Sequence, residues 1–341
     1  MINVYIDPSS YVNMENALFE KSKKYNMNNS REWAIFLKEY CTKNGINLQT
    51  IDMWNPAVAT SADVYVSFDH KILARKLYWK LRNKRYPIVD PSKFARRVLF
   101  QFEPPVVMPE VRYWIKKIPN LYESVFFTWK TGNPNIRHFF TPLPIPESGI
   151  FSEYWANTDR KFLTLINSNR RQISYYKELL TERIRAILFF SKTGDIDLYG
   201  RDWEKPLPFP YWFSKGAVRK VYRGVLEDKY KKLSQYTFAF TYENCELPGY
   251  ITDKVFDCFY VGTVPIYLGA LDVEEYIPKN SFIDMRDFKN YQELHMFLKS
   301  LSKEQIQAYK EEGRRFVESD LRKPFTNEHF ARTFVQAIQH K

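Results

Sequence analysis

Cysteine, glycine and long hydrophobic runs are all scarce in this chain of 341 residues. Its three cysteines, Cys41, Cys245 and Cys258, form neither a CxxC pair nor the even-numbered set of a disulfide framework, so we expect a reducing compartment. No stretch approaches the roughly 20 consecutive apolar residues of a membrane-spanning helix. Residues 1–7 lack the basic and long apolar regions of a signal peptide and have the pattern of a strand. We therefore expect a soluble, cytoplasmic protein.

Histidine is scarce too, and its five copies show no metal-ligand spacing. Charge of one sign is in excess: 51 lysines and arginines against 39 acidic residues give a net charge of +12. That excess favours an anionic partner, which leaves a nucleotide diphosphate, an anionic membrane surface or nucleic acid. The basic residues are scattered and form no clustered aromatic-basic motif, which argues against nucleic acid. Peripheral association with the inner face of the cell membrane stays open, because each Lys or Arg near an anionic leaflet contributes about 1 kcal/mol.

Short apolar strands alternate with amphipathic stretches along the chain, which is typical of α/β layers. In the first half we expect strands at 4–6, 64–68 and 98–102, and a helix over 31–41. In the second half we expect four strands, at 161–166, 197–200, 236–242 and 264–268, and two helices, at 175–190 and 250–260. Such sheets bind nucleotides beyond the carboxyl ends of their strands, near helix N-termini that favour phosphate.

One proline-rich segment divides these two series. Residues 141–149 hold three prolines and a glycine, so they form neither a helix interior nor a central strand. We interpret 141–153 as a linker between a first domain over 1–150 and a second over 154–341, the alternative being a long surface loop inside one domain. Two C-terminal helices, expected near 303–317 and 328–340, are candidates to return to the first domain.

The segment 242–256 has the pattern of a strand end, a polar turn and a helix start. On that helix Ile251 and Val255 share a face that can pack on a sheet. Asp253 and Lys254 are then displayed in the first turn, where free backbone N–H groups and the helix dipole favour an anion. A strand, turn and helix with one lysine is common, and taken alone it is most often structural.

Family resemblance decides the interpretation of this segment. The chain reads Tyr242-Glu243-Asn244, then Tyr250-Ile251-Thr252-Asp253-Lys254, then Gly262-Thr263-Val264-Pro265-Ile266-Tyr267-Leu268-Gly269. In order and spacing this resembles the signature of glycosyltransferase family ten, the α-1,3/4-fucosyltransferases, in its bacterial type. Residues 222–230, which lead into this core and include Lys229, look like the family's preceding stretch.

The resemblance implies both a fold and a reaction. The fold is α/β of GT-B type, with two Rossmann-like α/β domains facing across a cleft. The reaction is an inverting transfer of L-fucose from GDP-fucose to a hydroxyl of an oligosaccharide or glycolipid acceptor, with α-1,3 transfer to N-acetylglucosamine in a surface glycan as the default. The first domain would bind the acceptor and the second the GDP-sugar, and no metal or other cofactor is required.

The same resemblance implies a set of donor-binding residues: Arg170, Arg171, Tyr242, Glu243, Asn244, Tyr250, Thr252, Asp253 and Lys254. One arginine of the pair, with Arg171 favoured, would hold the diphosphate together with Lys254, although both arginines are also compatible with a solvated helix start. The chain departs from the family at Asp253, where a glutamate is usual. The carboxylate is kept but its reach is about one methylene shorter, so donor preference is open to change.

A basic pair suits the chemistry, because departing GDP develops negative charge on its β-phosphate that preorganised cations stabilise. A metal is the other way to supply that charge, and Asp195-Ile196-Asp197 matches the DxD pattern of metal-using transferases. It lies far from the core motif, just before an apolar strand, so we expect solvated or structural aspartates. Cys245, beside Asn244, is expected to be a packed small residue.

The acceptor hydroxyl needs a base on the opposite face of the sugar from the diphosphate. Residues 98–105 have the pattern of a strand that ends in Glu103 followed by two prolines. The family's general base is a glutamate at such a strand end, which assigns that role to Glu103, the alternative being an ordinary exposed carboxylate. Among the tryptophans Trp54, Trp114 and Trp129, we expect one or two aromatics to face an acceptor.

Two other functions remain open from the sequence. A related transferase could use another nucleotide sugar, because Asp253 departs from the family pattern. A non-catalytic protein of the same fold could bind a nucleotide or anion, which the basic charge alone would allow.

Overall fold

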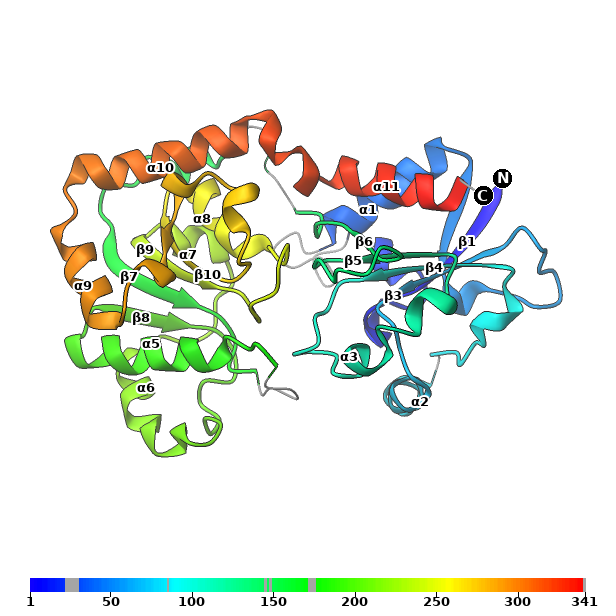
Figure 1. Ribbon diagram of the computed structural model, residues 1–341, viewed down its shortest axis with the longest axis horizontal. Helices are drawn as coiled ribbons and strands as arrows, with labels where there is room; N and C mark the ends of the chain where they lie inside the picture. Colours follow the sequence, from blue (N-terminus) through cyan, green and yellow to red (C-terminus); the bar gives the residue numbers. More distant parts are fainter. Residues whose placement is uncertain (22–30, 85, 144–145, 147–148, 171–175, 340–341) are drawn as a thin grey trace. The chain divides into compact units, whose positions relative to one another are not determined.

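The computed structural model describes residues 1–21, 31–84, 86–143, 146, 149–170 and 176–339. The chain divides into two compact units, Met1–Pro144 with Lys323–Lys341, and Ile145–Arg322. Figure 1 labels their helices and strands. None of the described helices combines the length and the apolarity needed to cross a membrane.

The first unit is built on a parallel sheet in the order β2-β1-β3-β4-β5-β6. Its strands are β1 (Ile2–Asp7), β2 (Ile46–Thr50), β3 (Val64–Phe68), β4 (Arg96–Gln101), β5 (Ser124–Phe127) and β6 (Arg137–His138). The sheet's inner strands are almost entirely buried and read as nearly continuous apolar runs, as expected where both faces of a parallel sheet are covered.

Among the described residues, the helices beside this sheet are α1 (Glu32–Lys43), α2 (Leu73–Arg82), α3 (Glu110–Trp114) and α11 (Asn327–Gln339). Helices α1 and α11 share one hydrophobic core with β1–β5, into which Leu37 and Phe334 project. Tyr65 and Leu99 alternate with these core positions and therefore lie on the opposite face, toward α2 and α3.

The second unit holds a parallel sheet in the order β11-β10-β9-β7-β8. Its strands are β7 (Lys161–Ile166), β8 (Ile196–Tyr199), β9 (Tyr236–Tyr242), β10 (Val264–Leu268) and β11 (Ile283–Asp284). Its helices are α4 (Ser152–Trp155), α5 (Leu180–Thr193), α6 (Lys215–Val221), α7 (Lys229–Leu233), α8 (Asp253–Val261), α9 (Tyr291–Ser300) and α10 (Lys303–Glu318).

The helices of the second unit cover both faces of its sheet, so the unit is doubly wound. Helices α5, α6 and α9 pack their apolar faces on one side, in a core that includes Phe190, Val218 and Leu294. On the other side α8 contacts β9 and β10, and α10 packs on α8 through Phe316 and Phe256. Loops follow the carboxyl ends of β7, β9 and β10, and this is the edge at which open α/β sheets bind ligands.

The main strands lie where the sequence predicted them, whereas the first residue of one helix differs from the prediction for a physical reason. Helix α8 begins at Asp253 rather than near 250, because the Thr252 N–H is bound by a carboxylate from outside the helix. The division of the chain falls at 144–145, within the segment interpreted as a linker. Residues 323–341 belong to the first unit, so of the two C-terminal helices that were candidates to return there α11 does return, because it packs its apolar face against α1. Helix α10 stays in the second unit.

Candidate functional site

In the first unit, Glu103 lies just beyond the end of β4, where the sequence placed it. Its side chain is partly exposed. The loop that carries it is held by Asp69, a buried residue after β3 whose Oδ1 accepts hydrogen bonds from the Glu103 and Phe102 N–H groups at 2.8 Å. Gln101 Nε2 donates to the same Oδ1 and to the Glu103 carbonyl. Burial raises the pKa of Asp69 while the two N–H donors and Lys71 oppose that rise.

Sequence reasoning missed Asp69, although a signal was present. It follows a buried strand directly and adopts a positive φ of 69°, a conformation in which aspartate is enriched among non-glycine residues. The role depends on a partner 34 positions away, Glu103, which no local pattern reveals.

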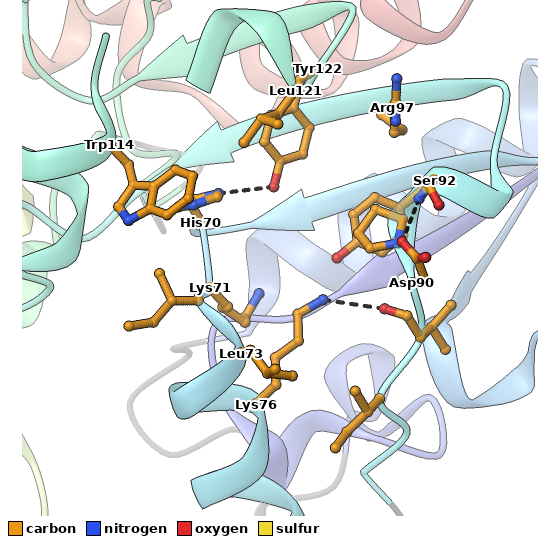
Figure 2. A pocket seen from close by; sticks show the side chains of 15 residues that line it. His70, Lys71, Leu73, Lys76, Asp90, Ser92, Arg97, Trp114, Leu121 and Tyr122 are labelled. Atoms are coloured by element: carbon orange, nitrogen blue, oxygen red, sulfur yellow. Dashed lines mark hydrogen bonds between the residues drawn. The ribbon is translucent and has the colours of Figure 1, made fainter. Parts of the chain in front are cut away.

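A cavity of about 580 Å³ lies between the first sheet and α2 and α3 (Figure 2). Its floor holds a buried ionic network, in which Lys71 pairs with Asp7 at 3.3 Å and Tyr65 donates to the same carboxylate at 2.8 Å. Trp114 lies at its wall and is 37% exposed. Of the three tryptophans weighed from the sequence, Trp114 alone lines this cavity, since Trp129 is buried and Trp54 packs against Phe94 in a tilted arrangement.

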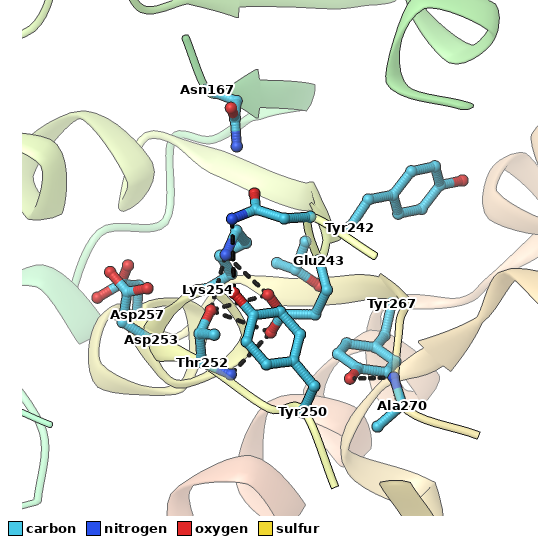
Figure 3. Close-up of polar contacts among 12 residues, drawn as sticks. Asn167, Tyr242, Glu243, Tyr250, Thr252, Asp253, Lys254, Asp257, Tyr267 and Ala270 are labelled. Atoms are coloured by element: carbon cyan, nitrogen blue, oxygen red, sulfur yellow. Dashed lines mark hydrogen bonds and ion pairs between the residues drawn. The ribbon is translucent and has the colours of Figure 1, made fainter. Parts of the chain in front are cut away.

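In the second unit, Glu243 follows β9 directly and is completely buried (Figure 3). Its carboxylate accepts a hydrogen bond from the Thr252 N–H at 2.8 Å and another from the Thr252 hydroxyl. It also pairs with Lys254 Nζ at 2.7 Å. A buried carboxylate from outside the helix therefore binds the N–H of the N-cap residue, the group that the N3 side chain of a capping box usually binds.

Lys254 thus lies in the first turn of α8, as the sequence predicted, but its ammonium group is paired with a carboxylate. The Lys254 side chain is 21% exposed, and its ammonium group is shared between Glu243 and the Thr252 hydroxyl. The pairing fixes where the ammonium group lies. It also leaves one side of that group open for a further acceptor.

A glycine is required beside Glu243. A Cβ built on Gly269 would lie 2.6 Å from Glu243 Cγ and 2.5 Å from the Tyr267 hydroxyl oxygen. The last residue of the motif is therefore a packing requirement of the buried carboxylate.

Arg183, on the buried face of α5, joins the strand ends. Its guanidinium donates to Asn167 Oδ1 after β7 and to the carbonyls of Tyr242 and Glu243 after β9. It also reaches Asn244 Oδ1 at 3.2 Å. Burial lowers the pKa of Arg183 to about 10, which leaves it charged at neutral pH. Sequence reasoning missed it, although an arginine within the apolar stripe of a helix was a visible signal.

A second ionic cluster connects α7 to α8. Lys229 pairs with Asp253 at 3.2 Å and with Asp257 at 2.5 Å. Burial would raise the pKa of Asp253, but Lys229 and Lys254 outweigh that and lower it to about 2. Burial raises the pKa of Asp257 to about 7 despite Lys229. Asp253 is 47% exposed, so one face of its carboxylate is open to a ligand.

The remaining predicted donor residues divide by exposure. Asn244 is partly exposed and lies 3.5 Å from the Tyr250 hydroxyl. Tyr250 is 3% exposed, and Tyr242 is 2% exposed and packs in the core with Phe240. Tyr242 therefore differs from the expectation: its side chain supports the strand end and does not face the open edge, because it falls on the core side of β9.

Arg170 is exposed in the loop after β7, and Arg171 lies outside the described residues. The loop is fixed on β8, because Asn167 N–H donates to the Tyr199 carbonyl and Asn169 N–H to the Arg201 carbonyl. A Cβ on Gly200, whose φ is +133°, would meet the Asn167 carbonyl oxygen at 2.0 Å. Only glycine allows that approach.

These groups surround a small cavity of about 40 Å³ at the carboxyl ends of β7 and β9, lined in part by Asn167, Lys229, Lys254 and Asp257. Two lysines and the N-terminus of α8 converge on one sheet edge, together with an open carboxylate at Asp253. Such a set can bind a phosphate group and a neighbouring hydroxyl.

The two aspartates that match the DxD pattern, Asp195 and Asp197, bind other side chains of the second unit. Asp195 is bound by His295 Nε2 and Lys299 Nζ, each at 2.8 Å. Asp197 pairs with Arg223 at 2.7 Å and accepts from the Tyr236 hydroxyl. The two side chains thus meet different partners and anchor the sheet. Cys245 is buried, as a packed small residue should be.

Among the comparisons with known proteins, the match to a family model falls within the second unit. The model of "Glycosyltransferase family 10 (fucosyltransferase) C-term" matches residues 160–312. Over 86 residues the chain is 36% identical to the alpha-(1,3)-fucosyltransferase FucT of Helicobacter pylori, an alignment that covers 25% of this chain and 18% of that protein. Over 139 residues it is 38% identical to 4-galactosyl-N-acetylglucosaminide 3-alpha-L-fucosyltransferase 9 of Mus musculus, covering 40% of this chain and 31% of that protein. The matches thus span less than a third of these relatives.

Solved structures resemble the whole chain. A crystal structure of alpha1,3-fucosyltransferase with GDP-fucose has a TM-score of 0.53 at 13% identity, covering 100% of this chain and 91% of that one. An alpha-glucosyltransferase in complex with UDP and a 13-mer DNA has a TM-score of 0.57 at 9% identity, covering 99% of each chain. At such identities the likeness concerns the fold alone. With the two parallel sheets, it confirms the predicted α/β fold of GT-B type.

Proposed function

We propose, from the match of the family-ten fucosyltransferase model to residues 160–312, that the protein transfers L-fucose from GDP-fucose to a hydroxyl of a glycan acceptor with inversion. The observation that carries the proposal is the buried Glu243 carboxylate, which holds Lys254 and the N-terminus of α8 together at the end of β9. The default product is an α-1,3-fucoside of N-acetylglucosamine in a surface glycan, formed in the cytoplasm.

The donor would bind at the carboxyl edge of the second sheet. Lys254 and an arginine from the pair Arg170 and Arg171 would hold the diphosphate, where negative charge develops as GDP departs. Asn244, Tyr250 and Asp253 would hold the guanosine or fucose portion. Cations fixed in advance do not have to reorganise during the reaction, and the ion pair of Lys254 with Glu243 supplies such fixation.

The acceptor would bind in the first unit. Glu103 would remove the proton of the attacking hydroxyl while the fucose to GDP bond breaks, so a β-linked donor yields an α-linked product in a single displacement. The cavity beside Trp114 offers a wall on which a sugar ring can stack. No step in this scheme requires a metal ion or other cofactor.

One variant tests the division of roles. Glu103→Gln should bind GDP with unchanged affinity and lose at least about a hundredfold in kcat, because a positioned base contributes about 10²–10⁴-fold. Calorimetric titration with GDP and a turnover assay measure the two quantities. Normal turnover would remove Glu103 from this role.

A second candidate function rests on Asp253. Its carboxylate is shorter than the family's usual glutamate and is drawn toward Lys229, so it can suit a different sugar. Turnover with GDP-fucose, GDP-mannose and UDP-sugars distinguishes the two transferases. Binding of GDP without turnover of any donor would instead indicate the non-catalytic nucleotide-binding protein.

A further inference from the structure

Helix α2 exposes apolar side chains where a surface helix normally shows polar ones. Leu73, Leu77 and Leu81 follow one another at intervals of four residues and are 62%, 48% and 85% exposed. The opposite side of the same helix buries Trp79 and Lys76. The leucine stripe is therefore surplus to the core, which has its own contacts on the other face.

The apolar surface continues from α2 onto α3 and the segment before β4. Arg75 of α2 and Glu110 of α3 form a bidentate ion pair, which holds the two helices side by side. Leu73, Ile88, Trp114 and Leu121 line the mouth of one cavity, and Figure 2 shows Leu73, Trp114 and Leu121 around it. All four are more than a third exposed, as is Tyr113 beside Trp114, so the stripe belongs to a contiguous patch.

Basic groups surround this patch. Lys80 precedes Leu81 on α2 and Arg82 ends that helix, while Lys116 and Lys117 lie just after α3. Arg82 lies over the Tyr78 ring and Lys117 over the Trp114 ring, so cation and aromatic face share the same surface. The acidic residues of the described segments 73–84, 86–93 and 110–121 are Glu110, which is paired with Arg75, and Asp90, which caps a turn at Ser92.

The second unit carries an independent surface of the same chemistry. Phe209, Trp212 and Phe213 are 71%, 52% and 89% exposed, and the Trp212 ring contacts both phenylalanines at 5.4 Å. They lie in and before the turn Tyr211–Ser214. Helix α6, which follows at once, brings the basic residues Lys215, Arg219 and Lys220.

We propose that this protein docks on an anionic bilayer surface through the α2–α3 patch of the first unit, and that the Phe209–Phe213 cluster of the second unit has a separate affinity of its own for such a surface. Leucines on one side of a helix with lysine and arginine beside them are the composition of interfacial helices. Exposed tryptophan, tyrosine and phenylalanine suit the depth of lipid headgroups, and the basic ring complements anionic ones. The leucine stripe distinguishes a bilayer from nucleic acid, because leucine side chains partition into the acyl boundary of a bilayer and offer bases no ring on which to stack.

Sedimentation of the full chain with vesicles tests the proposal. Vesicles containing 30–40% phosphatidylglycerol should bind it at least about tenfold more strongly than pure phosphatidylcholine vesicles, and raised salt should weaken that binding. Leu77→Ser/Leu81→Ser should lose about tenfold or more in partitioning, and Trp212→Ser/Phe213→Ser should lose a smaller part. None of these four residues lines the cavity or the donor site.

A matched control is Met296→Ser on α9, which removes an apolar side chain that is 59% exposed outside both surfaces and should leave vesicle binding unchanged. Thermal unfolding of each variant distinguishes lost docking from lost folding. Equal partitioning of the wild type and the Leu77→Ser/Leu81→Ser variant would overturn the proposal. The proposal would also be overturned if the protein did not bind vesicles but bound DNA in a gel-shift assay, with that DNA binding lost in the Leu77→Ser/Leu81→Ser variant. Because the readout is vesicle binding, it does not depend on the transferase activity.

Discussion

At the scale of single residues, Glu243 organises the donor-side edge more than any group that faces it. It is fully buried and yet binds the start of α8 and the Lys254 ammonium group together. A buried carboxylate is costly unless it is paired, so the ion pair and the fold around it depend on each other. A position predicted from the sequence to contact the donor is thus completely buried and holds Lys254 in place.

Lys254→Met should therefore have two separable effects. It leaves Glu243 buried without a cation, which should lower the free energy of unfolding by about 2–3 kcal/mol, at the lower end for such pairs because Lys254 is partly exposed. It should also abolish measurable GDP binding. The double variant Glu243→Gln/Lys254→Met should regain most of the stability and none of the GDP affinity. Denaturant titration and GDP calorimetry measure both, and recovery of GDP binding in the double variant would contradict the role of Lys254.

Asp257 and Asp253 give opposite pH dependences. The pKa of Asp257 is raised to about 7, so the folded chain holds a proton that the unfolded chain releases near pH 4, and this contribution to stability falls as pH rises from about 4 to about 7. The pKa of Asp253 is lowered to about 2, so its contribution is full above pH 4 and falls as pH drops toward 2. Asp257→Asn should flatten the decline between pH 4 and 7 in denaturant titrations. An unchanged slope would show that Lys229 keeps Asp257 ionised.

At the scale of elements, loops after parallel strands are fixed by partners distant in sequence. Asp69 after β3 binds the loop after β4, and Arg183 on α5 binds the loops after β7 and β9. Each loop thereby presents a candidate functional group from a rigid sheet edge. Gly200 and Gly269 serve the same purpose, because they admit close contacts with Asn167 and Glu243 respectively.

Asp69 acts as a positioning residue for Glu103 in this account. Asp69→Ala should lower kcat by about ten- to a hundredfold, because the Glu103 loop loses its common acceptor, and should leave GDP affinity unchanged. Asp69→Asn keeps an acceptor oxygen and should restore most of kcat. Steady-state kinetics with calorimetry on both variants measure this, and equal kcat losses in the two would point to a merely structural role.

A substitution at Gly269, directly after β10, tests the packing around the buried Glu243 carboxylate. Gly269→Ala places a Cβ 2.6 Å from Glu243 Cγ and should destabilise the protein by about 1–3 kcal/mol. Gly216→Ala within α6 has open space around it and should stabilise by about 0.5–1 kcal/mol. Thermal unfolding compares the two, and a neutral Gly269→Ala would mean that Glu243 has room to move.

At the scale of the whole molecule, what the sequence could predict follows from how local each feature is. Short apolar runs separated by amphipathic stretches predicted β3, β4, β7, β9 and β10, and the motif predicted α8. Both kinds of signal depend only on residues that are neighbours in the sequence. The short strands β2, β5, β6 and β11 lacked a pattern of their own. The burial of Glu243, the roles of Arg183 and Asp69, and the packing of α11 on α1 depend on contacts across many residues, which no local pattern encodes.

The most direct test of the central claim is the release of GDP from GDP-fucose with and without N-acetyllactosamine-type acceptors, in the presence of a chelator. The account predicts release that depends on acceptor and persists under chelation, with an α-fucoside as product. Absence of acceptor-dependent release with GDP-fucose, while GDP still binds, would contradict it.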